Sequence, residues 1–343
     1  MSVMGSRFVI TPPEDYVLAR DVCSYGYFRL APNRWDPARQ VLERTLDLHD
    51  GLARIEVQQA DAPGAVLKVV SDRVLSRTDK AQAVTMLRRM LHLDGAGSRD
   101  AIRAFHKIDP RWKASGRGRI FRSPTFFEDL VKTVTSCNVT WAVTVTMNRR
   151  LCEVINLGFP RPAQLARRRA AQLRSRCSVG YRDVRLIELG KMAVRGELDA
   201  DWFEDPANDD QAVYKRLLKL PGIGPYAAAN MMQLLGRYGF LAIDTEALRH
   251  GREVLGLKGK DGPLTKKLHK HYEPFGDQRF RSYWFELWTD HERTNGAAHT
   301  WPERDAAQPK KPAKHPARKP GAKRGTMSKT KSAKKPATRA KSH

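Results

Sequence analysis

Cysteine is scarce in this sequence of 343 residues, and long apolar runs are missing. The four cysteines, Cys23, Cys137, Cys152 and Cys177, are 114, 15 and 25 residues apart, which matches neither a zinc framework nor the ligand run of an iron–sulfur cluster. We therefore expect reduced, packed thiols and no metal. No apolar stretch approaches the ~20 residues that span a bilayer, and the amino terminus lacks a signal-peptide core. The sequence predicts a soluble monomer without membrane contact, cytoplasmic, at the nucleoid of a bacterium or in the nucleus of a eukaryote.

Acidic residues are absent from the last part of the chain. Between Pro309 and His343 there are 13 Lys or Arg and no Asp or Glu, interleaved with proline and small residues, which is typical of disorder. Removing these charges from the formal net charge of +25 leaves +12 on the first 308 residues. The rest of the chain is thus basic in its own right, which predicts a polyanionic partner.

The remaining chain has a strand-like sequence pattern followed by a helical one. Strand-like pieces ("YGYFRL", "QVLERTLDLHDG", "ARIEVQQ" and "AVLKVVSD") fill residues 25–72, with turn signals at Asp50-Gly51 and Pro63-Gly64. Helical periods follow, such as "RSPTFFEDLVKTVTSCN", for which Ser123 is the expected N-cap. We expect an α+β protein with a small antiparallel sheet lobe in residues 1–80, an all-helical core in 81–300 and a disordered basic tail in 301–343.

The stretch "LPGIGPYAAAN", residues 220–230, joins two of the expected helices through a turn of glycine and proline. Gly222 and Gly224 permit unusual backbone conformations and a close approach to the main-chain N–H groups. Pro225 suits a helix start, where free amides and the helix dipole favour an anion. The pattern predicts a helix-hairpin-helix with a seat for a DNA phosphate. A helix-to-helix turn without any ligand would use the same residues.

An aspartate follows the second of these helices. Asp244 comes after the apolar run "FLAI" and before "TEALRH", where it can serve as an ordinary N-cap. Amides at a helix start also hold a carboxylate ionised and fixed, as an electrostatic catalyst requires.

The stretch "LPGIGPYAAANMMQLLGRYGFLAIDTEALR" resembles the signature of the helix-hairpin-helix (HhH-GPD) DNA glycosylase superfamily. "SPTFFEDLVKTVTSCNVTW", "RRLCEVINLGFPRPAQLA", "SVGYRDVRLIEL" and "YEPFGDQRFRSYWFELW" extend the resemblance over roughly residues 16–288, closest to the 8-oxoguanine and 3-methyladenine branches. It implies damaged double-stranded DNA as the partner. The residues that it marks are a catalytic carboxylate, Asp244, a base pocket with Tyr226 and Asn230, and a DNA-binding hairpin with Leu220, Gly222 and Gly224. The hairpin could also hold a monovalent cation, whereas the cysteine spacing does not fit the iron–sulfur branches.

Tyr226 stands where the strand-cutting branches carry a lysine that forms a Schiff base. Because tyrosine cannot form that adduct, the resemblance implies a monofunctional hydrolase that leaves an abasic site. Asp244 would stabilise an oxocarbenium-like state and orient or deprotonate water, after the base has left the stack. Lys219, just before the hairpin, is expected to serve phosphate or solvent.

Three further residues match positions that engage the duplex in the 8-oxoguanine branch. Asn138 would fill the gap beside the orphaned partner base, while Tyr181 and Arg182 would wedge the stack and contact that partner. A helix C-cap for Asn138 and an ordinary loop for residues 180–182 are the alternatives. Val143 and Glu246 stand where that branch has an arginine and a histidine, so alkylated purines, oxidised purines and mismatched or deaminated pyrimidines stay open as substrates. A non-catalytic DNA-binding protein and a chromatin-like protein acting through its tail are the other classes.

Overall fold

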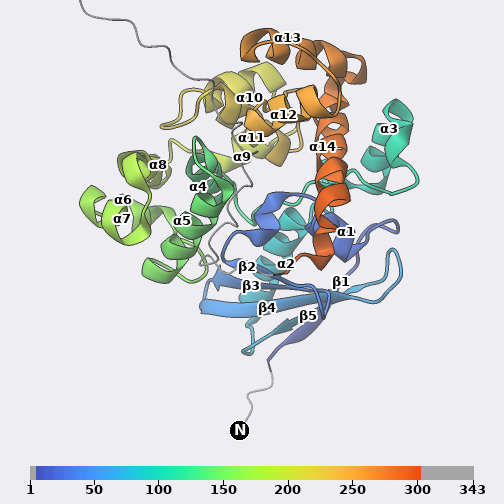
Figure 1. Cartoon of the computed structure of the whole chain (residues 1–343). Helices are drawn as coiled ribbons and strands as arrows, with labels where there is room; N and C mark the ends of the chain where they lie inside the picture. The colour runs from blue at the N-terminus through green and yellow to red at the C-terminus, as the bar shows by residue number, and fades with distance from the viewer. Residues whose placement is uncertain (1–4, 303–343) are drawn as a thin grey trace, which may run out of the picture. The chain divides into compact units, whose positions relative to one another are not determined.

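A five-stranded antiparallel sheet opens the part of the chain that the computed structural model describes, residues 5–302 (Figure 1). Its strand order is β1-β5-β4-β3-β2, with every neighbouring pair antiparallel. The strands are β1 (Arg7–Ile10), β2 (Asn33–Asp36), β3 (Val41–Leu48), β4 (Gly51–Gln59) and β5 (Leu67–Ser71). The expected sheet lobe is therefore confirmed.

The alternation of side chains sets the register of the central strands. Ile55 and Val57 in β4 are buried, whereas Arg54, which points to the opposite face, is exposed, as expected for a sheet with one covered face. Leu46 pairs with Ala53 across the β3–β4 hairpin, which closes at Asp50 and at Gly51 with φ +115°. The Asp50-Gly51 turn signal thus marks the hairpin correctly.

The segment "YGYFRL" is not a strand, contrary to the expectation from its sequence. Residues Gly26–Arg29 form a 3-10 turn, η1. Tyr27 and Phe28 are buried, and the Leu30 N–H donates to the Tyr27 carbonyl at 3.0 Å, the i to i+3 bond of a 3-10 turn. The prediction failed because aromatic residues are common to strands and to buried turns.

Helices make up most of the described chain after residue 76. The α-helices are α1 (Leu18–Val22), α2 (Arg77–Met90), α3 (Arg99–Ile108), α4 (Phe126–Ser136), α5 (Trp141–Val154), α6 (Pro162–Ala166), α7 (Ala170–Cys177), α8 (Asp183–Val194), α9 (Ala200–Glu204), α10 (Asp210–Leu217), α11 (Pro225–Leu234), α12 (Thr245–Glu253), α13 (Asp261–Tyr272) and α14 (Arg279–Asn295). Short 3-10 turns are η2 (Gly95–Gly97), η3 (Pro110–Trp112), η4 (Gly180–Arg182), η5 (Glu273–Gln278) and η6 (Ala298–Thr300).

Helix α4 connects the sheet to the hairpin helices. Its N-cap is Thr125, whose hydroxyl accepts from the Glu128 N–H at 3.2 Å, and not the expected Ser123, which is buried before the helix starts. Glu128 forms a buried ion pair with Arg44 of β3 at 2.6 Å, and α4 also packs against α11. Helix α4 thereby fixes the position of the hairpin relative to the sheet.

The sheet and the helices belong to one compact unit, which includes all of the described residues, 5–302. The expected boundary near residue 80 is the change from strands to helices within that unit. Trp301 packs on Trp288 with ring centroids 5.5 Å apart, so the packed part of the chain includes residue 301. The expected basic tail, residues 309–343, lies outside the described residues.

Candidate active site and nucleic-acid interface

The turn between α10 and α11 uses its two glycines for different reasons. Gly222 has φ +84°, in the left-handed region that glycine adopts without strain. Gly224, the N-cap of α11, has φ −94° and ψ −175°, which any residue could adopt, and a Cβ there would meet nothing within 4 Å. Gly222 thus provides the backbone conformation that the turn requires. The missing side chain of Gly224 leaves the space beside the main chain at residue 224 open.

Two apolar side chains hold this turn in the core. Leu220 and Ile223 are buried, and the Ile223 N–H donates to the Leu220 carbonyl at 3.1 Å. Leu220 can therefore face DNA only through its main chain. Pro225 is the first residue of α11 and has no N–H, so the next amides, those of Tyr226 and Ala227, are the first donors of the helix. Binding of a phosphate at these amides stays a prediction.

Asp244 is the N-cap of α12, and its carboxylate accepts from the Ala247 N–H at 2.9 Å. Burial raises the pKa of Asp244 above its ordinary value, the Ala247 hydrogen bond opposes that rise, and the charge of Glu246 adds to it. The carboxylate is therefore fixed in direction and poorly solvated, two conditions that strengthen its field on a nearby cation.

The Tyr226 phenol lies within the electrostatic reach of this carboxylate. Burial is the main reason that the pKa of Tyr226 is raised, and the charge of Asp244 is the second reason. The pKa of Tyr283 on α14 is raised by the same two causes in the same order, with Tyr226 as the third. The fold thus gathers two neutral phenols and one carboxylate from α11, α12 and α14.

Asn230 lies one turn after Tyr226 on α11 and is 3% exposed. Its Oδ1 accepts from the Tyr25 hydroxyl at 2.7 Å and from Gln233 Nε2 at 2.6 Å, and its Nδ2 donates to Thr133 Oγ1 at 3.0 Å. With its amide engaged in this network, Asn230 ties α11 to Tyr25 and to Thr133 of α4, so in the described conformation it has a structural role in place of the predicted contact with a base.

Asn138 and Tyr181 are accessible, as DNA-contacting residues should be. Asn138 follows the end of α4 with φ +54°, a left-handed conformation that asparagine adopts more readily than most residues. Tyr181 is 49% exposed, and the guanidinium carbons of Arg182 and Arg185 lie 4.5 and 4.8 Å from its ring centroid. Two cations thus hold an exposed aromatic ring in place.

Arg182 does not occupy the predicted position on the surface. It is 4% exposed, its Nε donates to the Val134 carbonyl at 3.1 Å, and its Nη2 donates to the Cys137 carbonyl. These carbonyls lie at the end of α4, where the helix itself provides no donors. Arg182 therefore braces the segment before Asn138, and the DNA contact expected of it is replaced by this supporting role.

Arg185 is a residue of this surface that was not predicted from the sequence. It is exposed on α8, stacks on Tyr181, and its Cδ would lie 3.0 Å from a Cβ at Gly222. Arg185 thus connects the hairpin turn to Tyr181 and places a positive charge between them. Its place one turn after Tyr181 was visible in "GYRDVR", but its contact with the hairpin depends on how α8 packs. Tyr25 and Tyr283 were missed for the same reason, since they reach the site from opposite ends of the chain.

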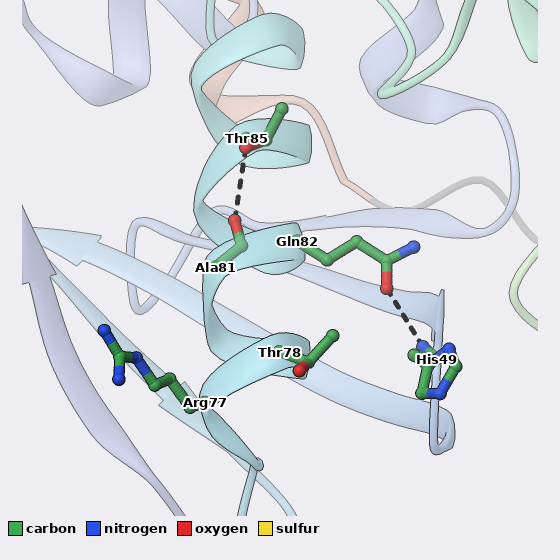
Figure 2. Close-up of a pocket in the computed structure, with 6 residues that line it drawn as sticks. All are labelled: His49, Arg77, Thr78, Ala81, Gln82 and Thr85. Carbon is green, nitrogen blue, oxygen red and sulfur yellow. Dashed lines mark hydrogen bonds between the residues drawn. The ribbon is translucent and has the colours of Figure 1, made fainter.

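The pocket drawn in Figure 2 is a separate feature of the molecule. This hollow of about 670 Å³ lies between α2 and the β3–β4 turn, and it is lined by His49, Arg77, Thr78, Ala81, Gln82 and Thr85. The Gln82 side chain accepts from the His49 main-chain N–H at 2.9 Å and so closes one side of it. None of the residues predicted for the active site or the DNA surface lines this pocket.

Within residues 5–302, no group of three or more His, Cys, Asp or Glu side chains is placed to hold a metal ion. The described helices also include none that is long and apolar enough to cross a membrane.

Comparison with solved structures shows which fold this is. The chain is similar to a 3-methyladenine DNA glycosylase from Archaeoglobus fulgidus, with a TM-score of 0.62 at 14% identity, over 82% of this chain and 98% of the other. It is also similar to the 8-oxoguanine glycosylase/lyase of Clostridium acetobutylicum in its apo form, with a TM-score of 0.61 at 17% identity, over 82% and 96%. The same enzyme bound to double-stranded DNA, with cytosine opposite 8-oxoguanine, matches with a TM-score of 0.58 at 16% identity, over 85% and 100%.

The fold that the sequence resemblance implied is therefore confirmed: the chain has the fold of the 3-methyladenine and 8-oxoguanine DNA glycosylases. No protein-family model and no curated protein sequence matched the chain.

Proposed function

We propose that this protein is a monofunctional DNA N-glycosylase of base excision repair. It binds damaged double-stranded DNA, turns an alkylated or oxidised purine out of the stack and hydrolyses its N-glycosidic bond, which leaves an abasic site. The observation that carries the proposal is the half-buried Asp244, which caps α12 within electrostatic reach of Tyr226 on the hairpin helix α11, in a fold shared with DNA glycosylases. A hairpin that only bound phosphate would need no such carboxylate.

Asp244 supplies the chemistry in this proposal. Breaking the glycosidic bond builds positive charge on the sugar, and the Asp244 carboxylate stabilises that charge and orients the attacking water. Because the Ala247 amide fixes one oxygen at 2.9 Å, the carboxylate needs little reorganisation during the reaction. In this proposal Tyr226, whose pKa is raised by burial and by the charge of Asp244, contacts the extruded base as a neutral phenol.

The positions of Lys132 and Lys219 argue against a lyase step. Tyr226 occupies the position of the Schiff-base lysine in the resembling branches. Lys132 of α4 is fully buried and paired with Glu128 at 2.7 Å, so its amine cannot reach a sugar in the described conformation. Lys219 is exposed at the start of the hairpin turn, where it suits a phosphate.

The proposal is tested by release of free base from a panel of duplexes. The panel carries 7-methylguanine, 3-methyladenine, 8-oxoguanine, uracil and a G·T mismatch, each with an undamaged control. We expect release of at least one modified purine and an abasic product that stays unbroken until it is treated with alkali. Binding to every duplex without any base release would favour the non-catalytic DNA-binding protein.

Borohydride trapping on the lesion that is released tests the mechanism. We expect no covalent adduct. An adduct that disappears in Lys219→Ala would show that the enzyme uses an amine and would overturn the monofunctional assignment.

A further inference from the structure

Trp141 packs directly on the main chain at Gly26. A Cβ at Gly26 would lie 2.9 Å from Cη2 and 3.1 Å from Cζ2 of the indole, closer than real Cβ contacts allow. Gly26 is not among the glycines with positive φ, so its backbone conformation does not call for glycine. The missing side chain at residue 26 is instead explained by the close approach of the Trp141 ring.

Trp141 nevertheless keeps a large part of its ring open. It is 39% exposed as the first residue of α5, although it is among the largest apolar side chains of the protein. A tryptophan that served only the core would be covered more completely, since burial of its area is what stabilises the fold. One part of the indole is therefore held on Gly26 while another part is available to a ligand.

Trp141 is near Asn138 along the chain and near η1 in space. Along the chain it follows Asn138 by three residues and is the first residue of α5, directly after the short connection from α4. Through Gly26 it touches η1, and the residues on both sides of Gly26 are Tyr25 and Tyr27.

These two tyrosines connect η1 to α11 and α4. Tyr25 donates to Asn230, one turn after Tyr226 on α11, and the hydroxyls of Tyr27 and Thr133 are 3.0 Å apart. The pKa of Tyr25 is raised mainly by burial and also by the charges of Tyr27 and Tyr226, which agrees with this proximity.

We propose that Trp141, seated on Gly26, stacks on the extruded nucleotide and favours purines over pyrimidines. The physical basis is that every base has a π face that stacks on an aromatic ring, and the two fused rings of a purine overlap an indole over a larger area. The inference rests on the proposed glycosylase function and names a residue that selects its substrate class.

The first test compares single-turnover base release by Trp141→Ala, Trp141→Phe and the wild type. On the purine lesion released fastest, Trp141→Ala should be slower by about 10- to 100-fold, the size of one lost base–aromatic stack, and Trp141→Phe should lie between. Release of uracil, if the wild type shows any, should fall less. Leu157→Ala, which truncates a side chain that is 58% exposed outside the site, is the matched control and should equal the wild type.

The second test uses Gly26 as the partner in a double-mutant cycle. Gly26→Ala inserts a methyl group into the space of the indole, so it should slow purine release in the wild-type background. In the Trp141→Ala background the clash is gone, so the same change should have almost no further effect. Equal losses in the two backgrounds would show that Gly26 acts without Trp141 and would overturn the inference.

A binding readout separates failure of this inference from failure of the proposed function. On adding a duplex with 7-methylguanine or 8-oxoguanine, tryptophan emission should be quenched more than with undamaged duplex. That difference should disappear in Trp141→Phe and persist in the control Trp202→Phe. The Trp202 ring is half-buried, and the guanidinium carbon of Arg216 lies 4.3 Å from its centroid.

A wild type that releases no base but shows this quenching would overturn the glycosylase and leave the stacking role intact. A wild type that releases purines while Trp141→Ala matches it within about twofold would overturn the stacking role alone.

Discussion

The hairpin turn and the segment that follows α4 are neighbouring parts of one surface, yet they present different groups to it. At the hairpin, Leu220 and Ile223 are buried and Gly224 leaves the main chain uncovered. After α4, side chains are accessible instead, namely Asn138 and Trp141. Main-chain groups can hold a phosphate of any nucleotide, whereas side chains can distinguish a base. We infer that the hairpin positions the duplex and that the second segment, with Tyr181, tests the base.

Arginines join these two parts. Arg185 lies against Gly222 and stacks on Tyr181, and Arg182 donates to the carbonyls that precede Asn138. A phosphate held at the hairpin would therefore place Tyr181 and Asn138 at a fixed distance from the DNA backbone. Substitutions in each part should separate the two functions.

Tyr181→Ala should produce the largest effect of the substitutions that distinguish these two parts. Loss of the exposed ring should slow single-turnover base release by about 10- to 100-fold, since one stacking contact is worth about 1–3 kcal/mol. Affinity for undamaged duplex, measured by fluorescence anisotropy, should stay within about twofold. Tyr181→Phe keeps the ring and should behave as the wild type. Equal weakening on damaged and undamaged duplexes would assign Tyr181 to the positioning part instead.

Gly222→Ala should act on stability and on both kinds of duplex. A left-handed φ of +84° costs a residue with a Cβ about 1–2 kcal/mol, which denaturant unfolding would measure. Duplex affinity should fall to the same extent with and without a lesion, because the turn carries no base recognition. Gly224→Ala is the matched control for stability, since its φ is ordinary and its Cβ would meet nothing. That variant should unfold like the wild type and still bind duplex less well, because its methyl group faces the phosphate seat.

Asp244→Asn should change the free energy of unfolding by less than Gly222→Ala does. Asp244→Asn should raise this free energy, whereas Gly222→Ala should lower it. Because burial raises the pKa of Asp244, the folded state takes up this proton more readily than the unfolded chain does. The stabilising contribution of the group is complete below its ordinary pKa of 3.8 and is lost as pH rises through the raised value, so the ionised carboxylate costs stability at neutral pH.

Asparagine can still cap α12 and carries no charge, so Asp244→Asn should raise the free energy of unfolding at pH 7 and lose that advantage below about pH 4. A decrease in stability at pH 7 would show that the carboxylate is favourably placed in the folded state. In the wild type, base release should decline as pH falls through the raised pKa, since protonation removes the charge that stabilises the sugar cation.

The sequence predicted those parts of the site that a short stretch of chain determines. The turn at Gly222, the start of α11 at Pro225 and the N-cap at Asp244 all depend on neighbours within a few residues, and all three occur as expected. The hydrogen-bond network around Asn230 could not be predicted in this way. Tyr25 meets Asn230 across 205 residues of sequence, and that contact depends on the packing of α4 and α11.

Arg182 illustrates a second limit of prediction from sequence. An arginine beside an exposed tyrosine suggests a DNA contact, but the carbonyls at the end of α4 need donors, and Arg182 supplies them from within the protein. Arg185, one turn further along the chain, keeps its place beside the hairpin. The choice between these two arginines follows from the packing of α8 and not from residue type.

The central claim, that Asp244 carries out base removal, is tested most directly by single-turnover release with Asp244→Asn on the lesion that the wild type prefers. Asp199→Asn is the matched control, because Asp199 caps α9 in the same manner, accepting from the Trp202 N–H at 3.1 Å. We expect Asp244→Asn to slow release by about 100- to 1,000-fold, comparable to the loss of one electrostatic group in other enzymes, with duplex affinity retained and Asp199→Asn fully active. Release by Asp244→Asn at the wild-type rate would contradict the claim.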